Sequence, residues 1–105
     1  MDFNSLMKAA QKMQDDMETR EKELKAKQYV STTSRSIVQV IMNGNYEVTS
    51  IEISNDFARD FTPDDKEILQ DAIMLAINEL TERISADKDD AIGDLAGSLR
   101  LPGLM

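Results

Sequence analysis

An apolar seam in the first quarter of the chain constrains the fold more than any other feature of the sequence. From Phe3 the apolar residues recur in alternating steps of three and four until Arg20 interrupts them, which is typical of a long helix with one narrow apolar stripe. Asp2 or Asn4 is suited to cap the start of this helix. We expect a helix over residues 1–28 whose seam needs a partner beside it. The seam consists of Phe3, Leu6, Ala10, Met13 and Met17.

Residues 29–54 predict a three-stranded antiparallel sheet. A polar, β-branched strand begins at Tyr29, and an almost wholly apolar strand runs over 37–42. The pair Asn43-Gly44 is typical of a tight hairpin in which both residues have positive φ. Along the return strand, 46–53, the apolar residues change parity between Val48 and Ile51. A β-bulge near Thr49-Ser50 would account for that change.

A second long helix is predicted over residues 62–88. Thr62-Pro63-Asp64-Asp65 combines a capping hydroxyl, a proline suited to the first turn and two carboxylates at the positive end of the helix dipole. A broad apolar band follows and is wide enough to pack on a sheet and on another helix. Beyond it, Gly93 and Gly97 weaken helix formation. We therefore expect a short separate helix and an extended apolar tail over 89–105.

The composition excludes most enzyme chemistry. The chain has 105 residues without any histidine or cysteine, so thiolate or imidazole metal sites and Ser-His or Cys-His nucleophile pairs are ruled out. The acids Asp87, Asp89, Asp90 and Asp94 suggest a calcium loop, but Ala91 and Ile92 stand where a ligand and a glycine are needed, so we expect none. We expect one domain over 1–105, no catalytic activity, no small-molecule substrate, and no cofactor or metal.

These elements predict an α+β fold in which a single chain leaves apolar surface uncovered. Two long helices on three strands leave open sheet edges and the seam of the first helix without a partner. A two-fold symmetric homodimer lets the same surface cover itself, so we expect the seam residues Phe3 to Met17 to form a dimer interface. The chain lacks the roughly 20-residue apolar run of a membrane span and begins without a basic, apolar leader. A cytoplasmic location is expected.

The order and spacing of several segments resemble the YbaB/EbfC family of bacterial nucleoid-associated proteins. The resemblance covers almost the whole chain, except that the glycine-rich stretch usual between the first two strands is replaced by Thr33-Ser34-Arg35-Ser36. It implies a tweezer-shaped homodimer whose protruding helices contact DNA, without catalysis. The matching segments are Leu6 to Gln14, Ile37 to Val40 with Asn43-Gly44, Val48 to Ile53, Asp65 to Asp71 with Asn78, and Leu101-Pro102-Gly103.

The charge distribution limits where DNA can bind. The net charge is −8, but residues 1–35 hold seven bases and six acids, against five bases and fourteen acids in the rest. Phosphate contacts therefore fall to the N-terminal third. We expect the turns beyond Met17 to project from the core, and Lys8 and Lys12 to lie near it. The predicted contacts to double-stranded DNA, weak and salt-dependent, are Arg20, Lys22, Lys25, Lys27 and Arg35.

Two other interpretations remain open. The four helical cations each follow an acid by four residues, so they could serve the helix itself. An acidic, dimeric protein-interaction module or secretion-type chaperone without DNA binding would also explain the acidic segment. Its partner surface would use Met7, Met13 and Met17 or the apolar tail. Retention on DNA-cellulose at low salt separates this function from DNA binding.

Overall fold

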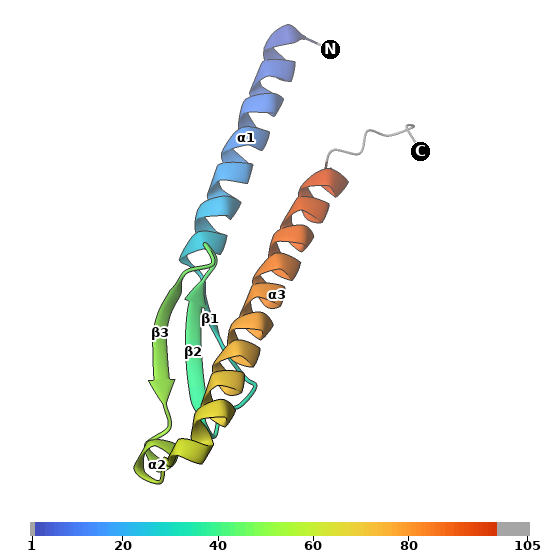
Figure 1. Ribbon diagram of the computed structural model, residues 1–105. Coiled ribbons are helices and arrows are strands. Elements are labelled where there is room, and N and C mark those ends of the chain that lie inside the picture. Colours follow the sequence, from blue (N-terminus) through green and yellow to red (C-terminus); the bar gives the residue numbers. More distant parts are fainter. Residues whose placement is uncertain (1, 99–105) are drawn as a thin grey trace.

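The computed structural model describes the backbone of residues 2–98 and the side chains of residues 2–93. The strands form a small antiparallel sheet with the order β1-β2-β3, and the molecule measures 71 × 26 × 14 Å. The helix α1 joins one end of this sheet, whereas α3 starts at the other end, runs along the sheet and extends past it beside α1 (Figure 1). The α+β prediction is confirmed. None of the described helices is long and apolar enough to cross a bilayer. The elements are α1 (Phe3–Ala26), β1 (Gln28–Val30), β2 (Val38–Asn43), β3 (Val48–Ile53), α2 (Asn55–Arg59), the 3₁₀ turn η1 (Pro63–Asp65) and α3 (Lys66–Ser98).

The core lies between α3 and the first two strands. Alternate residues of β2 point toward α3, because successive side chains of a strand face opposite sides of the sheet. Every fourth residue of α3 meets them, since that spacing keeps side chains on one helix face. Tyr29 contributes the aromatic ring from β1. The buried apolar residues are Tyr29, Val38, Val40, Met42, Ala72, Ala76, Leu80 and Ile84.

The second long helix is longer than predicted. The turn η1 leads into it after Thr62, whose backbone N–H and hydroxyl both donate to the Asp65 carboxylate, at 2.9 and 3.1 Å, and α3 itself begins at Lys66. The predicted end at residue 88 is wrong, because α3 continues without a break to Ser98. A single glycine costs a helix only about 1 kcal/mol relative to alanine, so Gly93 does not end it. The predicted extended tail, 101–105, lies outside the described residues.

The β2–β3 hairpin exists, but its turn is not the one predicted. Asn43 is not among the residues with positive φ; Tyr46 is, at 61°. The Tyr46 N–H donates to Asn43 O at 3.1 Å, and the Asn43 N–H donates to Glu47 O at 2.9 Å. This is a three-residue loop, a type I turn followed by one left-handed residue. The predicted bulge is confirmed at Thr49, since Ile41 pairs with Ser50 and Met42 with Val48.

Smaller differences concern element ends. The first helix starts after Asp2, whose carboxylate accepts from the Asn4 N–H at 3.3 Å, and it ends at Ala26 rather than 28. The first strand begins at Gln28 and is only three residues long. The helix α2 was not predicted. It is a single turn that starts after Ser54 and places Phe57 edge-on to Phe61, with ring centroids 5.9 Å apart.

Candidate nucleic-acid interface

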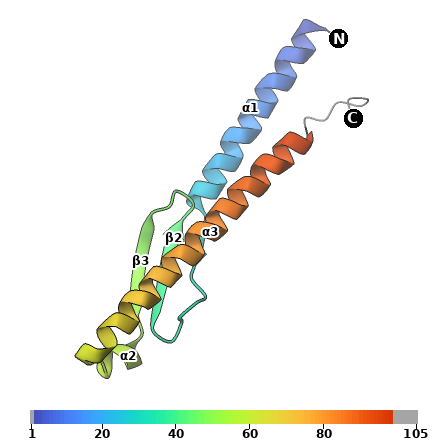
Figure 2. The same ribbon diagram turned by 45° about the vertical axis from the view of Figure 1, so that its right-hand side comes forward.

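The first helix forms an arm that stands away from the core. None of its residues is buried. Its N-terminal half extends past the end of the described part of α3, whereas its last turns lie against α3 and the hairpin (Figures 1 and 2). With 24 residues at a rise of about 1.5 Å per residue, the arm is about 36 Å long.

The predicted orientation of this helix is therefore wrong. We expected the turns beyond Met17 to project and Lys8 and Lys12 to lie near the core, but the reverse holds. The reason is connectivity, because Ala26 is followed almost at once by β1. A covalent link of one residue holds the C-terminal end of α1 at the sheet, so the opposite end must be the free one.

The free end of the arm carries positive charge without neighbouring acids. Residues 3–14 contain Lys8 and Lys12 and no carboxylate. Both lysines are exposed, and neither forms an ion pair with any described residue. Their spacing of four puts them on one helix face, opposite the apolar seam. Covering the seam therefore leaves both ammonium groups accessible.

The base of the arm, in contrast, is tied to α3. Lys27 Nζ lies 2.8 Å from Asp87 Oδ2 and 4.9 Å from the centre of the Tyr29 ring. Hydrogen bonds from Lys27 and then Tyr29 are the main causes that lower the pKa of Asp87 below its usual range. Arg20 Nη1 donates to Ala91 O at 3.4 Å. The open cleft here, about 500 Å³, has Arg20, Lys27, Asp87 and Asp90 in its lining, so its cations face carboxylates.

The remaining predicted cations are not brought together. Lys25 pairs with Glu21 at 3.1 Å, as its spacing indicates. Lys22 is exposed and has no ion pair within the part of the chain described. Arg35 is exposed in the β1–β2 loop, at the end of the sheet away from α1 (Figure 1). The six residues of β2 separate it from the arm by about 20 Å.

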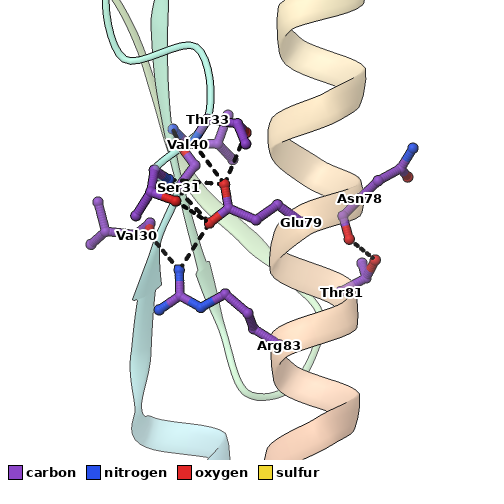
Figure 3. A network of polar contacts seen from close by, with 9 residues as sticks. Val30, Ser31, Thr33, Val40, Asn78, Glu79, Thr81 and Arg83 are labelled. Carbon is purple, nitrogen blue, oxygen red and sulfur yellow. Dashed lines mark hydrogen bonds and ion pairs between the residues drawn. The ribbon is translucent and has the colours of Figure 1, made fainter.

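The loop that carries Arg35 is held by a residue that the sequence did not single out. Glu79 of α3 accepts hydrogen bonds from the backbone N–H and the hydroxyl of both Thr32 and Thr33, at 2.8–3.1 Å (Figure 3). Arg83 adds a 2.7 Å bond to Val30 O and an ion pair of 3.2 Å to Glu79. Burial is the largest single influence and raises the pKa of Glu79, but the hydrogen bonds from Thr33 and Thr32 together lower it to about 2.

Several apolar surfaces of the described residues are uncovered, including Ile68, Met74 and Leu75 on α3, and two of them bear on assembly. The first is the predicted seam of α1, where Phe3 is 71% exposed, Leu6 and Met17 are about half exposed, Ala10 is exposed and Met13 is half-buried. The second is on β3. Val48, Ile51 and Ile53 are 41, 49 and 38% exposed, although they pair with the buried residues of β2 and share their sheet face. The helix α3 covers β1 and β2 but leaves this strip open.

Known proteins resemble this chain over nearly its full length. The profile of the YbaB/EbfC DNA-binding family matches residues 1–99. A nucleoid-associated protein of Clostridium novyi is 38% identical over 104 residues, covering 99% of this chain and 89% of its own. One from Pelotomaculum thermopropionicum is 39% identical over 102 residues, covering 97% and 94%.

A solved structure shares the fold. The crystal structure of an uncharacterized protein from Helicobacter pylori superposes with a TM-score of 0.70 at 22% identity, covering 91% of this chain and 98% of its own. That likeness concerns the fold alone, whereas the profile match and the identity to the curated relatives extend to the sequence. The chain belongs to the YbaB/EbfC DNA-binding family.

Proposed function

We propose that this protein is a non-enzymatic, nucleoid-associated protein that binds double-stranded DNA as a homodimer through its α1 arms. The observation that carries the proposal is the free end of the arm, where Lys8 and Lys12 stand exposed on three turns without a carboxylate. Phosphate contacts need cations of this kind, free of neighbouring acids. The relatives' names as nucleoid-associated proteins support the same role and a location at the nucleoid.

The binding is expected to be weak, tolerant of sequence and strongly salt-dependent. Lysine contacts phosphate as a point charge and carries little base information, and nonspecific binding of this type has dissociation constants of roughly 10⁻⁴ to 10⁻⁶ M. The net charge of −8 does not prevent it, because at physiological salt charges beyond about 8 Å are largely screened. Of the predicted contacts, Lys22 and Lys25 extend the arm surface, and Arg20, Lys27 and Arg35 take a smaller share.

Titration of DNA binding against salt tests this function. In K8Q/K12Q, log K should fall less steeply with log salt, the slope changing by about 0.9 for each phosphate that the variant no longer neutralises. The control R59Q/K66Q removes the same charge at the far end of the molecule, where Arg59 and Lys66 are also exposed, and should keep the wild-type slope. Equal slopes for both variants would contradict the assignment. Absence of any DNA retention at low salt would instead favour an acidic interaction module or chaperone.

The homodimer is proposed from the uncovered apolar surfaces on α1 and β3. The β3 strip is continuous with the hydrophobic core, because Val48, Ile51 and Ile53 share a sheet face with the buried side of β2. A second copy placed there would extend that core. The α1 seam is narrower, and arms that stand apart to receive a duplex cannot also pair seam to seam. We therefore assign the main interface to the β3 strip, and the seam interface stays a prediction.

Light scattering of the purified protein tests both surfaces. The wild type should have twice the 11.8 kDa mass of one chain. Ile51→Glu, which places a charge in the β3 strip, should give a monomer, whereas Leu6→Glu on the seam should remain dimeric. The opposite result would return the interface to Phe3, Leu6, Ala10, Met13 and Met17. A monomeric wild type at micromolar concentration would remove the dimer altogether.

A further inference from the structure

We infer that Gly44, at the tip of the β2–β3 hairpin, forms the backbone contact that sets the direction of the α1 arm and so positions this arm for DNA. This inference rests on the proposed function for its DNA consequence, but not for its structural part. Gly44 is buried although it lies in a turn. Its N–H donates a 3.1 Å hydrogen bond to Lys27 O, directly after the end of α1. The hairpin tip and the base of the arm are therefore in direct contact.

Glycine is required here by close approach and not by backbone conformation. The φ of Gly44 lies outside the left-handed region, so its backbone is open to any residue. A Cβ at this position, however, would overlap the backbone carbonyl of Leu24 and lie 3.0 Å from Lys25 N. Backbone atoms of a helix cannot rotate away as a side chain does. The two segments must separate if residue 44 carries a side chain.

The arm is the part that can yield. No residue of α1 is buried, while the hairpin is fixed by the β2–β3 pairing and by the Tyr46 hydroxyl, 2.8 Å from Ser85 Oγ. The core between α3, β1 and β2 has no contribution from α1. A clash at residue 44 is therefore relieved by a rotation of α1 about its short link to β1. Because the arm is about 36 Å long, a small rotation at the base moves Lys8 and Lys12 by several ångströms.

The test uses Gly44→Ala with Gly93→Ala as its matched control. Gly93 lies in α3, and a Cβ there meets nothing within 4 Å. Since the chain has no cysteine, Gln11→Cys on the arm and Glu82→Cys on α3 allow specific spin labelling. Labelled protein is diluted into unlabelled protein so that distances arise within one chain. Gly44→Ala should shift or broaden the distance distribution between residues 11 and 82, and Gly93→Ala should leave it unchanged.

Binding to duplex DNA is then measured at low salt. Misaligned arms cannot engage one duplex together, so Gly44→Ala should lose affinity by about tenfold or more, with Gly93→Ala near wild type. Unchanged distances in Gly44→Ala would contradict the inference that Gly44 sets the direction of α1. Altered distances with unchanged affinity overturn its link to DNA and leave DNA binding by the protein intact. If the wild type binds no DNA, the proposed function fails. The distance measurement alone then decides whether Gly44 sets the direction of α1.

Hydrogen exchange of the wild type covers the case in which Gly44→Ala does not fold. The Gly44 amide donates to Lys27 O and is buried under the arm. It should therefore exchange much more slowly than the exposed amide of an unstructured peptide. Exchange at the unprotected rate would contradict the contact between Gly44 and the base of α1 without the need for any substitution.

Discussion

The Tyr29 hydroxyl donates a 2.7 Å hydrogen bond to Asp87 Oδ2, which joins β1 to the middle of α3. Lys27 Nζ contacts the same oxygen at 2.8 Å. One carboxylate oxygen thus binds both Tyr29 of β1 and Lys27, the residue that links α1 to β1. As a result, Asp87 neutralises the positive charge of Lys27 at the base of the arm.

Asp87→Asn should separate these two effects. Loss of the carboxylate weakens both contacts and should lower the free energy of unfolding by about 1 kcal/mol, measured by urea denaturation. It also releases Lys27 for phosphate. The control Asp89→Asn removes an exposed acid without a described ion pair. If Lys27 contributes to DNA binding, affinity should rise more in Asp87→Asn than in Asp89→Asn; equal changes would remove Lys27 from the interface.

Tyr29 should ionise only at strongly alkaline pH. Burial first, and then the hydrogen bond to Asp87, raise the pKa of the Tyr29 phenol from 10.0 to about 12. Stability from this group is complete below pH 10 and is lost as the pH rises toward 12. In a Tyr46→Phe background, near-ultraviolet absorbance reports Tyr29 alone, since the chain has two tyrosines. Adding Asp87→Asn should move the midpoint down; a midpoint near 10 in both proteins would refute the contact.

Glu79→Ala should be among the more destabilising substitutions outside the apolar core. It leaves the N–H groups and hydroxyls of Thr32 and Thr33 without their acceptor and Arg83 without its ion pair. Hydrogen bonds to a charged group are worth about 1.5–3 kcal/mol, so we expect a loss of about 2–3 kcal/mol in urea denaturation. Glu79→Gln keeps an acceptor and should lose less. A Gln variant as unstable as Ala would contradict this and would mean that the negative charge is decisive, since a neutral acceptor of the same shape does not replace it.

The same carboxylate makes stability depend on acidity. The pKa of Glu79 is about 2 in the folded protein, against 4.5 for the free side chain. A lowered folded pKa gives stability that is complete above pH 4.5 and is lost progressively as the pH falls toward 2. The difference in the free energy of unfolding between wild type and Glu79→Gln, measured by urea denaturation, should therefore shrink from pH 6 to pH 3, by at most about 1.4 kcal/mol for each unit of the pKa shift. A constant difference over that range would show that Glu79 is not ionised in this network.

Local patterns predicted local structure well. The cap at Asp2, the capped turn after Thr62 that leads into α3 and the bulge at Thr49 each depend on a few neighbouring residues, and each is found. The hairpin turn differs from the predicted one because Asn43-Gly44 is compatible with both a two-residue and a three-residue loop. The contact of Gly44 with Leu24 and Lys27 favours the three-residue loop. No short window of sequence contains that contact.

Long-range relationships could not be predicted in this way. Heptad spacing reveals the seam of α1 but not which end is free, and that error reversed the expected positions of Lys8 and Lys27 relative to the core. The sequence separation of 60 residues between Lys27 and Asp87 hides their ion pair. Glu79 was overlooked for a similar reason, since a single acid on a helix face gives no sign that two threonines lie opposite.

Ser34 marks a position where glycine should stabilise this chain. Its φ is 57°, in the left-handed region, and its carbonyl accepts from the N–H groups of Ile37 and Val38 at 2.9 Å. A left-handed backbone costs a residue with a Cβ about 1–2 kcal/mol, while glycine loses about 0.5–1 kcal/mol through greater freedom when unfolded. Ser34→Gly should therefore raise the free energy of unfolding by about 0.5–1 kcal/mol. Ser36→Gly, two residues on and without positive φ, carries only the entropic loss and should destabilise. If both variants lose stability in urea denaturation, the left-handed conformation at Ser34 is not the strained element of this loop.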